Sequence, residues 1–403
     1  MTIAVTGGYV VPVVGAPIEG GTVLIDGGRI AAVGPAADVD VPDDAEIVDA
    51  SGSWVLPGFV EAHGHVGVLE ESEGWEGRDL NETTNPVTAQ VSALDAINPD
   101  DEGFRDALAG GVTTIVVKPG SGNVIGGQTV AVKAWGRTAD EMLVRAPISV
   151  KSALGENPKR NYGERNVMPA TRLGVAAVIR EALTKAQDYR ARRDRARENG
   201  EPFDRDLADE TLARVLDGEI PWCQHAHRAD DIATAIRLAD EFGYRLVLNH
   251  GTEAHLIADL IAERDIPVVV GPLFVSRLKV ELRNRTLRTP GILARAGVRI
   301  AITTDHPVVP INFLVHQVTL AVKEGLDEET GLRSITTNPA EMMGIGDRVG
   351  ALAPGLDADV VLWSGDPLDV MSRATRVFVN GRSVYRFDEQ TGFGVTESPF
   401  HRG

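Results

Sequence analysis

The chain has 403 residues, of which 43% are hydrophobic, and a formal net charge of −18 at pH 7. This length and composition allow one large hydrophobic core with a smaller second unit, which excludes a wholly disordered chain. The negative charge argues against nucleic acid as a partner, and the single cysteine excludes an internal disulfide, a cysteine-rich zinc ribbon and a secreted disulfide scaffold.

The first residues, MTIAVTGGYVVPVVG, lack the positively charged start of a signal peptide. Apolar runs elsewhere are shorter than the roughly 18 residues of a membrane span. A reducing compartment fits the cysteine content. We therefore expect a soluble, cytoplasmic protein without a membrane partner.

Short β-strands are predicted in residues 1–57. Strand-like apolar runs separated by turns occur in IAVTGGYVVP, in GTVLIDGGRIAAVG with its Asp-Gly-Gly turn, and in AEIVDASGSWVLPG. Residues 350–403 repeat this pattern, with Asn380-Gly381 as a two-residue turn. The two ends can pair into one small composite β-sandwich domain, although two separate hairpin units fit the same pattern.

Residues 58–349 alternate strand-like apolar runs with helical stretches, which is the pattern of a parallel sheet covered by helices. We expect an α/β fold in which these residues form a distorted (β/α)8 TIM barrel, the catalytic domain. Seven strands are predicted, at residues 59–63, 113–118, 147–153, 221–225, 245–250, 266–270 and 298–304. The gap left for an eighth strand falls in residues 160–220, where apolar spacing indicates an amphipathic helix instead.

Candidate metal ligands stand where these strands end, and in barrels of this kind the chemistry lies at the carboxyl ends of the strands. His63 and His65 are two residues apart, so at a strand end both side chains reach one ion. Such a pair alone is equally typical of structural histidines. Because His225, His250 and Asp305 close later strands, however, imidazoles and a carboxylate converge on one face of the barrel. This donor set suits Zn²⁺ or a similar divalent metal.

Two ions per chain would need a bridging anion, and the sequence offers two candidates. Glu156, in KSALGENPKR, could bridge directly, and Lys151 could bridge after carbamylation. We prefer Glu156 because Lys151 lies inside a strand and requires a modification. The alternatives are a carboxylate at a helix start for Glu156 and a buried cation for Lys151.

The expected mechanism uses a water molecule that the metal acidifies to a pKa of about 7. Asp305 would accept its proton as general base and return it to the leaving nitrogen as general acid. Covalent catalysis is not supported, because no serine or cysteine stands in a recognisable nucleophile motif.

Further residues are candidates for substrate contact. His227 follows His225 by two residues, so it either contacts substrate or is itself a ligand, and His306 either lines the pocket or makes loop hydrogen bonds. The glycine-rich stretch PGSGNVIGGQ, residues 119–128, is either a substrate-binding loop, with Asn123 and Gln128 as contacts, or a strand-to-helix turn. Surface or helix positions are expected for three other histidines, His255, His316 and His401.

Taken together, the sequence resembles the amidohydrolase superfamily and, within it, the imidazolonepropionase-like amidohydrolases. The resemblance runs along nearly the whole chain and rests on LPGFVEAHGH, AGGVTTIVVKPGSGNVIGGQ, GENPKR, HAHRADDI, LNHGTEAH, TTDHPV, TTNPAEMMGI and VGALAPGLDADVVLWSGDP. It implies the distorted barrel with a composite sandwich, ions held by the histidines and Asp305 named above, and Asp305 as proton shuttle.

The resemblance also sets the expected reaction. Deaminases of this superfamily carry a glutamate soon after the histidine of the fifth strand, whereas here His225 is followed by Ala-His-Arg-Ala-Asp. We therefore expect hydrolysis of an amide, peptide or lactam bond in a small molecule, with heterocycle deamination as the alternative. A catalytically inactive relative is the remaining hypothesis, although no ligand position is missing. A homo-oligomer is plausible for the family.

Overall fold

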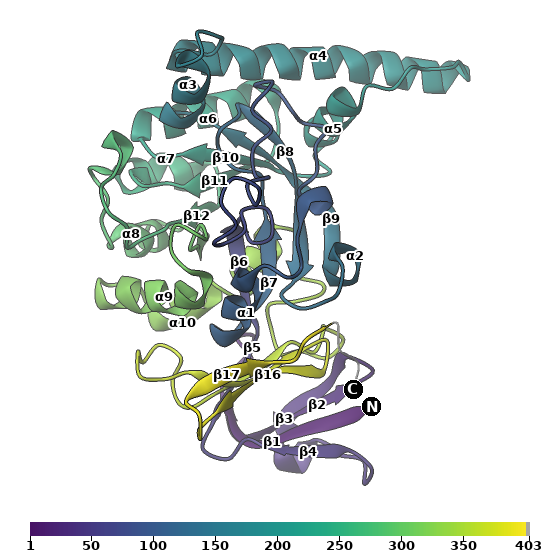
Figure 1. Cartoon of the computed structure of the whole chain (residues 1–403), viewed down its shortest axis with the longest axis vertical. Helices are drawn as coiled ribbons and strands as arrows, with labels where there is room; N and C mark the ends of the chain where they lie inside the picture. Colours follow the sequence, from purple (N-terminus) through teal and green to yellow (C-terminus); the bar gives the residue numbers. More distant parts are fainter. Residues whose placement is uncertain (400–403) are drawn as a thin grey trace.

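Two β-sheets organise the chain in the computed structural model, which describes residues 1–399. One sheet has eight strands and forms the barrel, and the other has nine strands and is built from both ends of the chain. Figure 1 shows the purple and yellow strands of the termini together at one end of the molecule, with the barrel and its helices beyond them. Within the described residues no helix has the length and apolar character needed to cross a membrane.

The barrel sheet contains all seven predicted strands, with bounds that differ by a few residues. In spatial order the strands are β6 (Phe59–Gly64), β7 (Val112–Val117), β8 (Ile125–Lys133), β9 (Leu143–Ala153), β10 (Trp222–Ala226), β11 (Leu246–His250), β12 (Val268–Val270) and β13 (Ile300–Ile302). Each pairs in parallel with its neighbour except β8, which runs antiparallel to both β7 and β9.

The predicted position of the eighth strand was wrong. It is β8, and it begins inside the glycine-rich stretch that the sequence suggested as a loop. Residues 160–220 contain no strand and are mainly helical, in α3 (Glu156–Gly163), α4 (Arg172–Asn199) and α5 (Leu207–Leu216). The prediction failed because it assumed that every barrel strand is followed by a helix, whereas β7, β8 and β9 follow one another as antiparallel neighbours.

Side chains close the barrel between its first and last strands, β6 and β13. The buried Glu61 carboxylate accepts hydrogen bonds from the N–H of His63 and the N–H of Thr304, both at 2.9 Å. It also accepts from the hydroxyls of Thr303 and Thr304, at 2.5 and 2.6 Å. The chain near residues 334–335 completes the seam, because its carbonyls accept from the N–H groups of Ile302 and Val60. The seam therefore fixes the strand end that carries His63.

Helices surround the barrel sheet (Figure 1). Besides α3 to α5 they are α1 (Glu102–Ala109), α2 (Ala139–Met142), α6 (Ala229–Phe242), α7 (Ala258–Glu263), α8 (Thr289–Arg295), α9 (Leu314–Lys323), α10 (Glu328–Arg333) and α11 (Thr337–Met342). The longest, α4, begins where the Thr171 hydroxyl accepts from the Gly174 N–H, and it ends at Gly200, whose φ of 69° favours glycine.

The terminal sheet joins the two ends of the chain. Its order is β17 (Phe393–Thr396), β16 (Arg382–Asp388), β15 (Ala374–Val379), β14 (Val360–Trp363), β5 (Trp54–Pro57), β1 (Thr2–Val10), β2 (Ile18–Asp26) and β3 (Arg29–Pro35), with β4 (Glu46–Asp49) beside β1. The antiparallel pairing of β5 with β14 makes one continuous sheet, so the alternative of two separate hairpin units is wrong.

A buried ion-pair network joins the barrel to the terminal sheet. The ammonium of Lys133, at the end of β8, lies 2.7 Å from a carboxylate oxygen of Asp359 and 3.0 Å from one of Asp357. All three side chains are at most 4% exposed. Asp357 also pairs with Arg348 at 2.9 Å, so both carboxylates are compensated despite their burial.

Candidate active site

A cavity of about 730 Å³ lies at the carboxyl ends of the barrel strands. Its walls carry most of the predicted site residues, namely His63, His65, Lys151, His225, His227, His250 and Asp305. They lie on β6, β9, β10 and β11, or directly after the ends of β6, β10 and β13. The convergence that the sequence predicted from separate strand ends is therefore present in the structure.

Asp305 is the centre of a first group of possible ligands. Its carboxylate lies 3.0 Å from Nε2 of His63 and 3.3 Å from Nε2 of His65, and its other oxygen lies 4.0 Å from Nδ1 of His250. One ligand atom each from His63, His250 and Asp305 fall within 4.8 Å of one another. Both His250 and Asp305 have positive φ, 73° and 53°, and such strain in non-glycine residues is typical of functional sites.

The protonation of this group suits a bound cation. Burial alone would raise the pKa of Asp305, but the surrounding histidines outweigh it and hold this pKa well below its usual range. Burial lowers the pKa of His250 to about 4. The Nδ1 atoms of His65 and His250 are each 2.8 Å from a backbone carbonyl, so they carry the proton and leave Nε2 as a lone-pair donor.

A second group combines two predicted residues with one that the sequence reasoning missed. One ligand atom each from His225, His227 and Glu281 lie within 4.8 Å of one another. Burial lowers the pKa of both histidines well below the usual value, so they are neutral donors. Glu281 belongs to the short turn η4 (Val280–Leu282) after β12. No motif marks it, but it is the only acidic residue between positions 266 and 304.

The preferred bridging residue is not where the sequence prediction put it. Glu156 begins α3 and is not among the residues that line the cavity. Its backbone N–H donates to Glu281 at 2.7 Å, which agrees with the alternative of a helix-start carboxylate. Lys151 does line the cavity, and its ammonium lies 3.3 Å from Nε2 of His63. Burial lowers the pKa of Lys151 to about 7, so the neutral amine is accessible.

Three predicted substrate contacts point elsewhere. His306 is buried, and its Nδ1 accepts a hydrogen bond from the Ile311 N–H, which is the loop role given as its alternative. The Asn123 amide donates to backbone carbonyls at positions 82 and 85. The Gln128 amide donates to the Thr211 hydroxyl on α5. None of the three lines the cavity, although residues 120–122 of the same glycine-rich stretch do.

The remaining histidines lie outside the cavity where the structure describes them. His255 belongs to the 3-10 turn η3 (Ala254–Ile257), and its Nδ1 shares a hydrogen bond with the Thr289 hydroxyl. His316 lies on α9. His401 lies outside the described residues.

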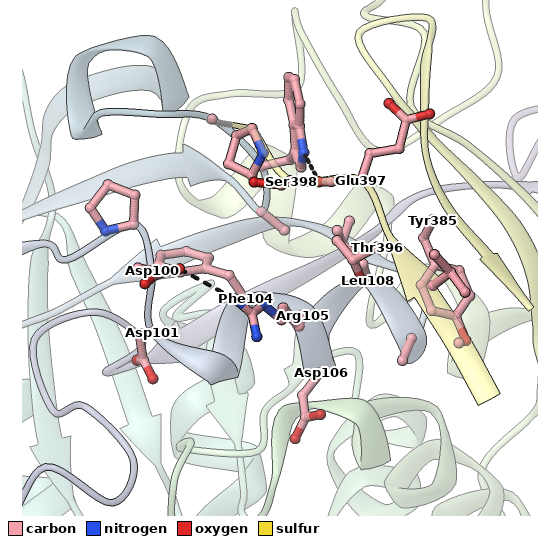
Figure 2. A pocket seen from close by; sticks show the side chains of 18 residues that line it. Asp100, Asp101, Phe104, Arg105, Asp106, Leu108, Tyr385, Thr396, Glu397 and Ser398 are labelled. Atoms are coloured by element: carbon pink, nitrogen blue, oxygen red, sulfur yellow. Dashed lines mark hydrogen bonds and ion pairs between the residues drawn. The ribbon is translucent and has the colours of Figure 1, made fainter. Parts of the chain in front are cut away.

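A separate hollow of about 530 Å³ lies between α1 and strands β16 and β17. Figure 2 shows its polar side chains, including Asp100 and Arg105, which pair with each other at 3.3 Å. Tyr385 and residues 394–399 form the opposite wall. No histidine lines this hollow, and none of its residues belongs to the two groups of possible metal ligands.

The Amidohydrolase family model matches residues 54–384. The chain belongs to this family. A solved amidohydrolase from Thermotoga maritima MSB8 is 45% identical, with a TM-score of 0.92 over 95% of this chain and 100% of that one. Amidohydrolase tasK of Hapsidospora irregularis is 31% identical over 91% of this chain, which spans only 40% of that protein. An imidazolonepropionase of Rhizorhabdus wittichii is 28% identical, over 86% of this chain and 88% of its own length.

These relatives confirm the predicted family and enzyme class. The chain is an imidazolonepropionase-like amidohydrolase, a hydrolase acting on C–N bonds. The family is generally metal-dependent, and the two ligand groups fit that requirement.

Proposed function

We propose that the chain is a metal-dependent hydrolase of an amide, peptide or lactam bond in a small molecule, with two divalent ions such as Zn²⁺. The observation that carries the proposal is the contact of one ionised carboxylate, Asp305, with the Nε2 atoms of His63 and His65 at the wall of the cavity.

The residues present fit divalent ions. The first group offers neutral imidazoles and an anionic oxygen, and the second repeats this donor set. Two buried ring nitrogens have no hydrogen-bond partner, namely Nδ1 of His63 and Nδ1 of His225. They remain available as lone-pair donors to a metal ion. A bound divalent ion supplies Lewis acidity, which lowers the pKa of a coordinated water to about 7 and polarises the scissile carbonyl.

Asp305 supports the proposed proton transfer. Its side chain is 16% exposed, so it reaches the cavity while the histidines keep it ionised. It would accept a proton from the attacking water and donate it to the leaving nitrogen, because a carboxylate on the cavity wall can exchange a proton with groups bound there. Lys151 replaces Glu156 as our candidate for the ligand that bridges the two ions, since of these two residues only Lys151 lines the cavity.

The preference for amide hydrolysis over deamination rests on the residues after His225, since positions 226–230 contain no glutamate. N-acyl amino acids, dipeptides, hydantoins and lactams are the substrates to screen on metal-loaded enzyme. Release of a carboxylate product supports the proposal. Release of ammonia from an exocyclic amine would instead support a deaminase.

The proton-shuttle role is tested with Asp305→Asn, which keeps the size of the side chain. We expect kcat to fall by about 10²–10⁴-fold, the usual contribution of a positioned acid–base group. His316→Asn, a substitution on α9 away from the cavity, is the matched control and should keep full activity. Chelation should abolish activity in the wild-type protein and added Zn²⁺ should restore it. Full activity after exhaustive chelation would refute the metal dependence.

A further inference from the structure

Lys279 is a half-buried cation on the wall of the cavity that holds the histidines. It lies in the loop that leads from β12 to η4. One of its three ammonium N–H groups donates to the amide oxygen of Asn157 at 2.9 Å. In residues 1–399 no carboxylate forms an ion pair with it. Two N–H groups of this ammonium are therefore left for a ligand.

Asn157, on α3, holds this ammonium close to the histidines. Its amide nitrogen donates to the Ser121 hydroxyl at 2.7 Å and lies 3.5 Å from Nε2 of His225. Because the oxygen and nitrogen of an amide are bonded to the same carbon, the Lys279 ammonium lies within about 9 Å of that ring nitrogen. Ser121 belongs to the glycine-rich stretch and also lines the cavity. Lys279 is thus tied to two other segments of the cavity wall.

The other charged groups of the cavity do not neutralise Lys279. In the described part of the chain its walls carry two carboxylates, of which Asp305 is engaged by histidines and Glu164 is exposed. They also carry two further basic side chains, of which Lys151 is the candidate bridging ligand and Arg160 is exposed. Since the chain has a net charge of −18, an anionic substrate needs a local cation, and Lys279 is the one closest to this description.

Much of the remaining wall is aliphatic. The side chains that line it are Leu69, Leu80, Val275, Leu278, Leu282 and Val308. Leu278, directly before Lys279, is 87% exposed. An apolar group bound here would remove such surface from water, which favours binding. The cavity therefore offers an apolar wall beside an ammonium group.

We propose that the substrate is an N-acylated α-amino acid with an apolar side chain, whose free carboxylate binds the Lys279 ammonium. The inference rests on the proposed amide hydrolysis and narrows its substrate class. In such a molecule one carbon atom separates the carboxylate from the scissile nitrogen, which suits the short distance between Lys279 and His225. Dipeptides belong to this class, whereas hydantoins and simple lactams lack the carboxylate and are expected to be poor substrates.

The reaction on this substrate is a simple hydrolysis. The oxygen of water adds to the acyl carbon, the C–N bond breaks, and the leaving nitrogen takes a proton. The products are a carboxylic acid and the free amino acid. Lys279 is then a specificity-determining residue, because it contacts the part of the substrate that does not react.

The test compares N-acetyl-L-leucine with N-acetyl-L-leucinamide, in which a neutral amide replaces the carboxylate. Both compounds are assayed on metal-loaded protein by release of the free amine, and calorimetric titration gives their dissociation constants. We expect the wild-type protein to prefer the carboxylate compound by at least about tenfold, as expected for a hydrogen bond between charged groups.

Variants assign this preference to one side chain. Lys279→Met should abolish it by raising KM with little change in kcat, since the lost contact serves binding and not the chemical step. Lys279→Arg keeps the charge and should keep most of the preference. Lys159→Met is the matched control, because it removes the same charge from an exposed position on α3 outside the cavity, and it should behave as the wild type.

Several outcomes would overturn the inference. Equal binding of the two compounds by the wild-type protein contradicts it, as does a preference that Lys279→Met retains. A preference that is lost in Arg160→Met and kept in Lys279→Met would assign the carboxylate to the wrong cation. If Lys279→Met does not fold by circular dichroism, Lys279→Gln takes its place in the comparison.

Failure of the inference and failure of the proposed function are distinguishable. If N-acetyl-L-leucine is neither bound nor hydrolysed while other amides are hydrolysed, the substrate class is wrong and the proposed function stands. If no amide, peptide or lactam is hydrolysed, the proposed function fails, and the calorimetric comparison of the two compounds still decides whether Lys279 binds a carboxylate.

Discussion

Replacement of Glu61 by alanine is predicted to weaken the barrel where β6 meets β13. The substitution removes the acceptor of two backbone N–H groups, those of His63 and Thr304. A buried donor left without an acceptor costs about 1–3 kcal/mol, so these two together cost about 2–6 kcal/mol. The Thr303 hydroxyl adds little, because it lies 2.7 Å from the His63 carbonyl and can donate there instead.

This prediction is checked by urea unfolding of metal-free protein, because a bound ion would add its own stabilisation to the folded state. The loss of stability follows from the shift of the unfolding midpoint. Glu82→Ala is the control, since Glu82 is an exposed carboxylate that accepts from the Thr84 hydroxyl, and it should leave the unfolding midpoint close to that of the wild type. A loss below about 1 kcal/mol in Glu61→Ala would refute the idea that this carboxylate holds the seam.

Two further predictions concern the network between the barrel and the terminal sheet. Lys133→Met should destabilise the protein by about 3–5 kcal/mol in the same urea assay, because it leaves Asp359 buried without its cation, and a wild-type midpoint would contradict this. The second prediction is a pH dependence: burial alone would raise the pKa of Asp357, but Arg348 and Lys133 outweigh it and lower this pKa below its usual value. The stabilisation by Asp357 is thus present above the unfolded pKa of about 3.9 and lost as the pH falls through the lower folded pKa. The difference in free energy of unfolding between wild type and Asp357→Asn should therefore shrink from about pH 5 to pH 3. A difference in free energy of unfolding that stays constant over this pH range would contradict the prediction.

The sequence predicted the strands that follow the regular βα alternation and the candidate ligands at their ends, which line the cavity. His63, His225, His250 and Asp305 could be found because each closes an apolar run, and a strand end fixes where a side chain points. The strands of the two termini were also predicted, but their pairing with each other was not, because two separate hairpin units fit the same pattern.

The sequence did not predict features that depend on contacts between distant segments. Strand β8 was not predicted, because its antiparallel direction follows from pairing with β7 and β9, and not from its own glycine-rich start. Glu281 was not predicted because it lies in a short turn after β12, and no periodic pattern describes a loop. Which of Glu156 and Lys151 is the bridging residue stays a prediction: Lys151, on β9, lines the cavity, and Glu156, at the start of α3, does not.

The terminal sheet also constrains how the chain can fold during synthesis. Strand β5 must wait for its neighbour β14, and about 300 residues separate Pro57 from Val360 in the sequence. At translation rates of about 5–20 residues per second, the edge of β5 stays unpaired for roughly 15–60 s. An exposed strand edge is a template for aggregation, so a chain that ends before β14 would keep this edge open permanently. Truncations that remove β14 and the strands after it should therefore reduce soluble yield even though they remove no residue of the cavity.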